Sequence, residues 1–490
     1  MSQTATTGNA KANYETELDS WIKKEKAASN LIASIGDLLY EKSVELVLYR
    51  NPLVGENISE ILSIHKYAGD IVNKEVKVEN SSTLALELTK LDLAPSKIDI
   101  GKLAHEWEEE KSNFGSQKEF LETKLSSFFR KDNETFEPRD VVLYGFGRIG
   151  RLAARELIKQ AGKGQQLRLR GIVVRNNSED QIRKRASLLR MDSVHGAFVG
   201  TIIEDYENKA LIINGQTVNI IQASHPSEID YTQFGINNAL ILDNTGVFTD
   251  KEALSNHLKS KGVGKVILTA PGKEIPNIVY GINQKKFNVE DNDIFSAASC
   301  TTNAIAPILK VIEDNFNIEK GHIETVHAYT NDQNLLDNYH KKPRRGRSAA
   351  INMVITSTGA GKAVTKVVPS LSGKLTANAV RVPTPNGSLA IMNLTISKET
   401  SVEEINEVIK KYAFEGELVN QIKFSIEEEL VSNDIIGNTC CSVFDSPATI
   451  VSADGKNIVL YTWYDNEFGY TKQVIRLAKY VAKVRRLLYY

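Results

Sequence analysis

The strongest constraint on the fold is a glycine-rich turn between an apolar run and a helix-like pattern. Val141–Tyr144 predicts a buried strand, Gly-Phe-Gly-Arg-Ile-Gly follows at once, and the apolar spacing over residues 152–158 predicts a helix. Gly145, Gly147 and Gly150 allow a tight turn and a close backbone approach, and the helix start can receive a pyrophosphate. We therefore predict a Rossmann-type, dinucleotide-binding α/β domain with a parallel sheet.

The end of the next predicted strand bears on the choice of dinucleotide. This strand, Leu167–Val174, leads into Arg175-Asn176-Asn177. Folds of this type usually carry an acidic residue there, which holds the adenosine ribose and repels a 2′-phosphate. Asn177, our candidate cofactor-binding residue at this place, is neutral and lies close to the cation Arg175. NAD or NADP is the expected cofactor; the alternative is a polar loop whose arginine points into solvent.

One cysteine stands where a predicted strand changes into a predicted helix. Cys300 lies within Ala297–Asn303, before the helical pattern of residues 304–312. Unpaired N–H groups and the helix dipole favour a thiolate at such a place, so Cys300 is a candidate nucleophile. The alternative is a buried cysteine in a strand–helix corner. His327, in a predicted strand, is either its base or an ordinary hydrogen-bonded histidine.

The rest of the chain divides into a helical front part and a second half rich in strands. Amphipathic stripes predict an all-α extension over residues 1–136, which ends in the polar segment 130–138. We expect a Rossmann domain over residues 137–299, completed by a C-terminal helix over residues 467–490. Strands with fewer helices over residues 300–466 suit an α+β catalytic domain with a mostly antiparallel sheet.

Composition argues against several classes of function. The 490 residues carry 60 basic and 61 acidic side chains, so no overall charge attracts nucleic acid or a membrane surface. The 3 cysteines give no disulfide framework and suggest a reducing compartment. No apolar run approaches the length of about 18 residues that a membrane helix needs. We expect a cytoplasmic protein with no metal site, no nucleic-acid partner and no membrane partner.

Six longer stretches resemble the phosphorylating glyceraldehyde-3-phosphate dehydrogenases. They follow one another in the order that this family has: Gly145–Arg151, Ala298–Asn303, Thr325–Ala328, Ser357–Ala360, Arg381–Thr384 and Trp463–Tyr470. The resemblance runs from about Val141 to Tyr480. The helical extension lies outside it.

The resemblance implies a reaction and a set of site residues. In this family the cysteine matching Cys300 attacks glyceraldehyde 3-phosphate, and the histidine matching His327 acts as base. A hydride passes to NAD(P), and inorganic phosphate converts the thioester into 1,3-bisphosphoglycerate. The residues that match the family's contacts to the substrate phosphate are Thr330, Asp332 and Arg381. Those that match its contacts to the attacking phosphate are Ser299, Thr301, Arg345, Thr358 and Gly359. Those that match further cofactor contacts are Arg148, Ile149, Thr269 and Asn466.

Two departures from the family favour NADP. NAD-specific members carry an aspartate where this chain has Asn177. Many carry Leu-Pro or Gly-Pro at Asn338-Tyr339, a pair that helps to exclude a 2′-phosphate across a subunit interface. The resemblance also implies a homotetramer that acts in glycolysis or gluconeogenesis.

Two other functions remain as alternatives. The loop Asp337–His340 looks somewhat like that of erythrose-4-phosphate dehydrogenase, a sibling enzyme, although Thr358-Gly359 keeps the inorganic-phosphate site that the sibling has largely lost. The second alternative is a binding or regulatory role carried by the helical extension.

Overall fold

A computed structural model describes residues 4–129 and 136–490, with the backbone alone for residues 4–12. The chain forms two compact units, one of residues 1–136 with 485–490 and one of residues 137–484. Much of the polar segment that we expected to end the extension, residues 130–135, lies outside the described residues. None of the described helices is both long and apolar enough to cross a membrane.

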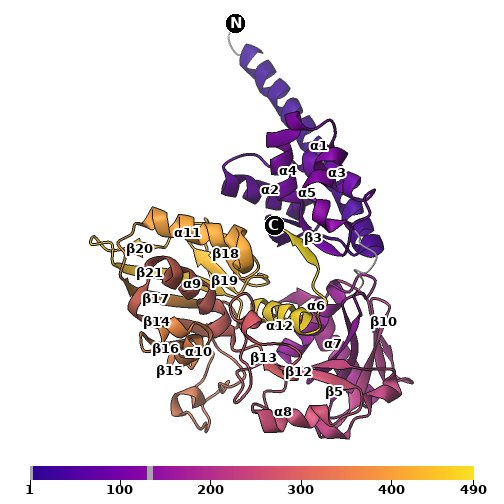
Figure 1. The fold of residues 1–490 in the computed structure, drawn as a ribbon, viewed down its shortest axis with the longest axis vertical. Coiled ribbons are helices and arrows are strands. Elements are labelled where there is room, and N and C mark those ends of the chain that lie inside the picture. Colours follow the sequence, from indigo (N-terminus) through magenta and orange to yellow (C-terminus); the bar gives the residue numbers. More distant parts are fainter. Residues whose placement is uncertain (1–3, 130–135) are drawn as a thin grey trace. The chain divides into compact units, whose positions relative to one another are not determined.

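The first unit is mainly helical, as the sequence predicts (Figure 1). Its helices are α1 (Thr4–Lys42), α2 (Ile58–Val72), α3 (Val78–Leu88), α4 (Ile100–Glu110) and α5 (Gln117–Lys124). It also contains a small sheet that the sequence analysis did not identify, so the extension is not purely α. The strands of this sheet, in spatial order, are β2 (Asn51–Pro52), β1 (Glu45–Leu48), β3 (Ser96–Asp99) and β22 (Leu487–Tyr489).

The last of these strands corrects one expectation. We predicted a single helix over residues 467–490, but helix α12 (Phe468–Val481) ends earlier and β22 pairs in parallel with β3. Lys483 takes a left-handed conformation (φ 57°), and the N–H of Val484 bonds back to the carbonyl of Lys479. This geometry closes a helix, usually with glycine at the left-handed position. Because a lysine stands there, the sequence gave no stop signal.

The second unit begins with the predicted Rossmann-type domain. Its eight-stranded sheet has the order β13-β12-β11-β4-β5-β10-β9-β8 and is parallel from β13 to β10. The strands are β4 (Arg139–Tyr144), β5 (Leu167–Val174), β8 (Ile202–Asp205), β9 (Ala210–Ile213), β10 (Gln216–Gln222), β11 (Ala239–Asp243), β12 (Val263–Leu268) and β13 (Ile294–Ser296). The helices are α6 (Arg148–Lys159), α7 (Glu179–Arg190) and α8 (Lys251–Leu258), and the short strands β6 (Met191–Asp192) and β7 (Gly196–Ala197) form a hairpin.

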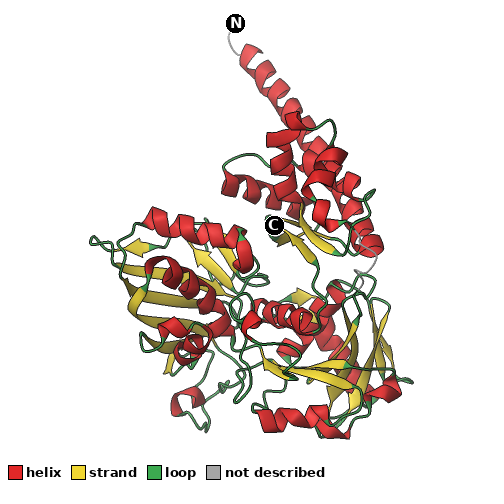
Figure 2. Ribbon diagram, viewed as in Figure 1, coloured by secondary structure: helices red, strands yellow, loops and turns green. Residues whose placement is uncertain are grey.

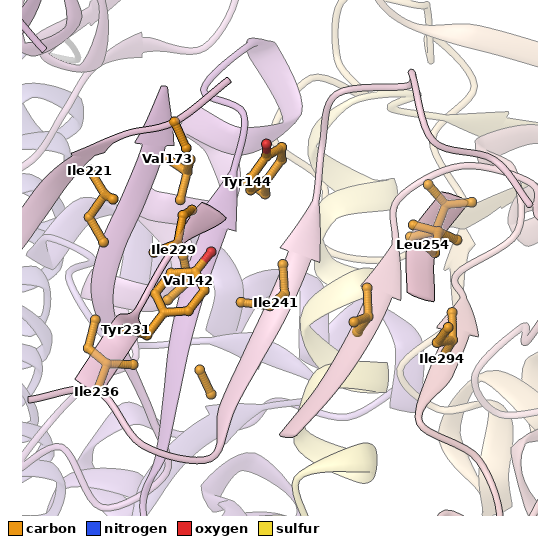
Figure 3. Close-up of a cluster of buried hydrophobic side chains, with 14 of the residues drawn as sticks. Val142, Tyr144, Val173, Ile221, Ile229, Tyr231, Ile236, Ile241, Leu254 and Ile294 are labelled. Atoms are coloured by element: carbon orange, nitrogen blue, oxygen red, sulfur yellow. The ribbon is translucent and has the colours of Figure 1, made fainter. Parts of the chain in front are cut away.

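A buried apolar cluster lies on one face of this sheet (Figure 3). Val142 and Ile241 extend from neighbouring strands, Tyr231 covers them from the segment before β11, and Leu254 comes from α8. Burial of such side chains stabilises the sheet by about 1.5–3 kcal/mol each. The cluster therefore fixes the strand ends around which a dinucleotide site can form.

The rest of the second unit is the predicted α+β domain (Figure 2). Its second sheet has the order β15-β16-β14-β17-β21-β19-β18, with β20 beside β21. All neighbours run antiparallel except β14–β16 and β18–β19. The strands are β14 (Ile318–Ala328), β15 (Val354–Thr356), β16 (Leu375–Val382), β17 (Ser388–Ile396), β18 (Ile422–Ser425), β19 (Ser442–Asp445), β20 (Ile450–Val451) and β21 (Asn457–Tyr464). Its helices are α9 (Cys300–Phe316), α10 (Ala360–Val367) and α11 (Val402–Phe414).

Candidate active site

Cys300 is the first residue of α9, four positions after the end of β13. Ser299 caps the helix, because its hydroxyl accepts the N–H of Thr302 at 3.0 Å. Just before it, Ala298 adopts φ 56°, a conformation that residues other than glycine rarely take. The hydroxyl of Tyr470 donates to the carbonyl of Ala298 at 2.9 Å. This hydrogen bond helps to hold the strained turn that presents the cysteine.

His327 lies next to this cysteine. Its Nε2 is 3.6 Å from Sγ of Cys300, and its Nδ1 lies 2.7 Å from the carbonyl oxygen of Ala328. With Nδ1–H donating to that carbonyl, Nε2 is left as a proton acceptor that faces the sulfur. The structure thus brings together the two candidate catalytic residues.

Arg381 lies behind the imidazole because of strand register. β14 and β16 run parallel with His327 opposite Arg381. Nη1 of Arg381 donates to the carbonyl of Ala328 at 2.8 Å and lies 2.9 Å from Nδ1 of His327. A guanidinium is therefore fixed beside the reacting pair.

The electrostatics of the pair favour a neutral base and a protonated sulfur. Burial, with the charge of Arg381, lowers the pKa of His327 to about 3, so its imidazole is neutral at pH 7. Burial also raises the pKa of the Cys300 thiol, although Arg381 and the hydroxyl of Thr301 oppose this shift. Desolvation thus outweighs the preference for a thiolate that we expected from the helix start. The sulfur keeps its proton until a base removes it.

The predicted phosphate-binding residues come from several segments, among them the Arg345 turn and the starts of α9 and α10. Arg345 donates from Nε to Thr356 Oγ1 at 3.1 Å and forms an ion pair with Asp332. Thr358 Oγ1 accepts the N–H of Ala360, and Gly359 is the N-cap of α10. The hydroxyl of Thr301 lies 4.0 Å from Cys300 Sγ and 3.1 Å from the hydroxyl of Tyr464. Ser299 is the cap described above, and Thr330 is partly buried in the loop after β14.

The direct pairing of Asp332 with Arg345 was not expected. The family resemblance assigns one of them to each phosphate, whereas in this structure their side chains neutralise each other. Binding of either phosphate to Arg345 would compete with this ion pair. The pair is partly exposed, so its rearrangement would cost little.

The glycine-rich turn Gly145–Gly150, called the fingerprint below, has the geometry that its sequence predicts. Gly145 has φ 92°, and a Cβ on Gly150 would lie 2.6 Å from the carbonyl oxygen of Gly145. A side chain at either position would strain or block the turn. A Cβ on Gly147 would meet nothing within 4 Å, which leaves room above the helix start. Ile149 lies within the first turn of α6, and these residues fit the pyrophosphate of a dinucleotide.

Ion pairs connect this fingerprint to the residue next to Asn466. Arg148 pairs with Glu467 and, at 3.1 Å, with Asp192. Asn466 accepts the hydroxyl of Ser388 at 2.9 Å through Oδ1. Thr269 follows β12 and donates to the carbonyl of Asp243 at 3.0 Å. Sequence reasoning missed the two carboxylate partners of Arg148, because they lie far from it in the chain.

A cavity of about 360 Å³ opens beside the fingerprint. The residues that line it include Phe146, Val174 and Phe248 and the two arginines Arg175 and Arg185. Asn177 does not line this cavity. Its side chain donates to the carbonyl of Ile220 at 3.0 Å instead.

Arg185 is a residue that the sequence analysis did not identify. It lies on α7, among the buried positions Ile182, Ala186 and Leu189. Its helical spacing with these residues predicts a position near the sheet, which was the available signal.

Comparisons with known proteins agree with this geometry. The family model for the NAD binding domain of glyceraldehyde 3-phosphate dehydrogenase matches residues 139–251, and that for its C-terminal domain matches residues 299–466. A glyceraldehyde-3-phosphate dehydrogenase-like protein of Pseudomonas aeruginosa is 47% identical over 458 residues, which cover 93% of this chain and 98% of that protein. That match therefore includes much of the helical extension.

Shorter relatives match the second unit. Glyceraldehyde-3-phosphate dehydrogenase of Priestia megaterium is 41% identical over 339 residues, 69% of this chain and 96% of the relative. Glyceraldehyde-3-phosphate dehydrogenase 1 of Bacillus subtilis is 40% identical over 344 residues, 70% of this chain and 98% of the relative.

Proposed function

This chain belongs to the glyceraldehyde-3-phosphate dehydrogenase family, and from that premise we propose that it is a phosphorylating enzyme. It oxidises glyceraldehyde 3-phosphate reversibly and joins the product to inorganic phosphate, which yields 1,3-bisphosphoglycerate. The observation that carries this proposal is the 3.6 Å approach of Cys300 Sγ to a neutral, fixed imidazole.

The first chemical step uses this pair. Nε2 of His327 accepts the thiol proton while Sγ of Cys300 attacks the aldehyde carbon. The new C–S bond forms as the carbonyl π electrons move to oxygen. The N–H of Cys300, which has no intrahelical acceptor at the first helix position, and the protonated imidazole stabilise that oxygen.

The later steps return the enzyme to its starting state. The protonated His327 first gives its proton to the oxygen, which forms the hemithioacetal hydroxyl. Nε2 then takes this proton back when the carbon is oxidised, and the product is a thioester on Cys300. A phosphate oxygen then attacks the thioester carbon, the C–S bond breaks, and the acyl phosphate leaves. The sulfur regains its proton from the imidazole.

Arginines hold the two phosphates in this proposal. Arg381, with Thr330 and Asp332, contacts the substrate phosphate, and Arg345, with Thr358, contacts the attacking phosphate. Both guanidinium groups present planar donor pairs that suit phosphate oxygens. Ser299, Thr301 and Gly359 add the hydroxyl and backbone donors near the sulfur.

A nicotinamide dinucleotide is the cofactor that this family and fold use, and when bound it supplies the hydride acceptor. The fingerprint Gly145–Gly150 would hold its pyrophosphate, and the amide of Asn466 would orient the nicotinamide carboxamide. We propose that the enzyme accepts NADP as well as NAD, because the segment directly after β5, residues 175–178, carries no carboxylate.

The exposed face of one loop supports a homo-oligomer. Leu335 is 73% exposed, Leu336 74% and Tyr339 90%, and Ile351 and Met353 follow in the same segment. Large apolar side chains clustered in this way mark a surface that another protein covers. We propose that this protein is a second copy of the chain, in a homotetramer of the kind that the family forms in the cytoplasm. Light scattering in a reducing buffer should give the mass of a tetramer.

Steady-state kinetics test the reaction itself. We expect oxidation of glyceraldehyde 3-phosphate that depends on added inorganic phosphate and on both NAD(P) and Cys300. Faster turnover of erythrose 4-phosphate, independent of phosphate, would instead assign the chain to the sibling activity. No turnover of either aldehyde would leave the binding role of the extension as the main function.

A further inference from the structure

The cavity beside the fingerprint has the shape and location of an adenosine site. It lies at the ends of β4, β5 and β11, where a Rossmann-type sheet binds its ligand. Its volume of about 360 Å³ falls within the usual range for small-molecule pockets. The side chains of Val174 and Phe248 provide apolar surface for an aromatic base.

The charge of the cavity is one-sided. Its lining includes two arginines, Arg175 and Arg185, and no carboxylate. Glu228 lies in the neighbouring turn, but its Oε2 accepts the backbone N–H groups of Ser224 and His225 at 3.2 and 3.1 Å. Two cations therefore line the cavity, and none of its lining residues is acidic.

The two arginines are free to bind an anion in different ways. Nη1 of Arg185 donates to the carbonyl and Oε1 of Gln181 at 2.9 and 3.0 Å, which fixes the guanidinium at the wall and leaves its other N–H groups for a ligand. Burial lowers the pKa of Arg185, as expected for a partly desolvated cation. Arg175 is exposed, and it makes no ion pair with any residue in the described ranges.

The residue after β5 at which folds of this type usually carry a carboxylate that selects NAD is Asn177 in this chain. Asn177 is uncharged, and its amide is committed to the carbonyl of Ile220 on β10. It therefore neither repels a 2′-phosphate nor forms an ion pair that would occupy one of the arginines.

We propose that Arg175 and Arg185 together hold the 2′-phosphate of NADP and make this enzyme prefer NADP to NAD. The proposal rests on the function proposed above, because it takes the cavity as the adenosine site of the dehydrogenase cofactor. Arg185 supplies the fixed contact, and Arg175 closes over the phosphate from the strand end. A planar guanidinium suits phosphate oxygens better than any other side chain.

Calorimetric titration of the full chain tests the site without catalysis. The probes are adenosine 2′,5′-bisphosphate and adenosine 5′-monophosphate, which differ only in the 2′-phosphate. We expect the bisphosphate to bind at least about tenfold more tightly, and Arg185→Ala to remove about ten- to a hundredfold of its affinity while affinity for the monophosphate stays the same. Arg175→Ala should act in the same direction with a smaller effect.

The matched control is Arg183→Ala on the same helix. Arg183 is exposed and pairs with Asp180, and it does not line the cavity, so both affinities should stay unchanged. Circular dichroism verifies the fold of each variant, and Arg185→Gln serves if the alanine variant is unstable.

Two outcomes would overturn the proposal. One is equal affinity of the wild type for the two probes, and the other is an Arg185 variant that weakens both probes equally. Failure of the proposed function looks different: glyceraldehyde 3-phosphate would not be oxidised with either dinucleotide, whatever the probes show. Oxidation of glyceraldehyde 3-phosphate with a strong preference for NAD would refute the role of the two arginines in selecting NADP, whereas the proposed function would still hold.

Discussion

Arg381 and His327 are register partners on two parallel strands, and Nη1 of the arginine lies 2.9 Å from Nδ1 of the histidine. This contact has two effects on the chemistry. Together with burial, which is the larger cause, the guanidinium disfavours a second positive charge and keeps the imidazole neutral at pH 7. In the function proposed above, it would also place a phosphate-binding group next to the base, so that bound substrate and catalytic residues would share one anchor.

Removing the charge of Arg381 should raise the pKa of His327. We expect Arg381→Gln to move that pKa from about 3 towards its ordinary value, with burial limiting the change, and to raise KM for glyceraldehyde 3-phosphate. A proton NMR titration of the imidazole measures the shift. Arg381→Lys retains a charge and is the control; an unchanged pKa in the glutamine variant would mean that burial alone sets it.

Substitutions of Cys300 and of His327 should lower activity by different amounts. We expect Cys300→Ser to lose dehydrogenase activity by several orders of magnitude, and His327→Asn to lower kcat by about 10²–10⁴-fold while slowing alkylation of Cys300 by iodoacetamide. Mass spectrometry of the alkylated peptide gives the second measurement. Cys440 is buried and outside the site, so Cys440→Ser should retain kcat; a His327→Asn protein with the full alkylation rate would exclude the histidine as base.

Buried histidines should make the protein less stable in acid. Burial lowers the pKa of His65 to about 4, so between pH 6.5 and 4 the unfolded chain binds a proton that the folded chain does not. The free energy of unfolding therefore falls as the pH falls through this window, by up to about 3 kcal/mol from this one group.

A matched pair of variants isolates this contribution. His65→Gln should flatten the pH dependence of urea unfolding, whereas substitution of the partly exposed His322 should leave it unchanged. His65→Gln also alters two hydrogen bonds, to Ile61 and Ser81, so its stability at pH 8 is the reference for each curve. An equally steep pH dependence in the variant would contradict the assignment.

The C-terminal strand should stabilise the first unit. Arg486 is buried and donates to Glu45 at 3.1 Å and to the carbonyl of Ser43 at 2.9 Å. Its replacement by methionine breaks a buried pair and should cost about 3 kcal/mol. Deletion of residues 485–490 should cost more, because it also uncovers the edge of β3.

Hydrogen exchange of β3 and proteolysis within the helical extension measure both effects. We expect faster exchange over Ser96–Asp99 in each variant. Tyr489→Phe is the mild control, since it removes a single hydrogen bond to Glu106. Unaltered exchange after the deletion would mean that β22 adds nothing to this sheet.

Local patterns allowed most of the fold and part of the site to be predicted. The strand and helix around Gly145–Gly150 and the junction at Cys300 are each set by a few neighbouring residues, so their sequences carry the signal. The approach of His327 to Cys300 depends instead on how β14 packs beside α9, which no local pattern encodes. Only the family resemblance pointed to it.

The misses have equally specific causes. β22 has three residues, too few for a periodic pattern, and the helix before it ends at a lysine in a left-handed conformation. Arg185 was overlooked because a cation on a helix normally indicates a solvated face. The ion pair between Asp332 and Arg345 joins residues whose expected roles lie at different phosphates.

The position of β22 has a consequence for how this protein is made. The sheet of the first unit combines strands from residues 45–99 with Leu487–Tyr489, so it lacks this edge strand while the ribosome makes the residues between them. A chain that stops before β22 would leave the edge of β3 unpaired, and such an edge is a template for pairing with another chain.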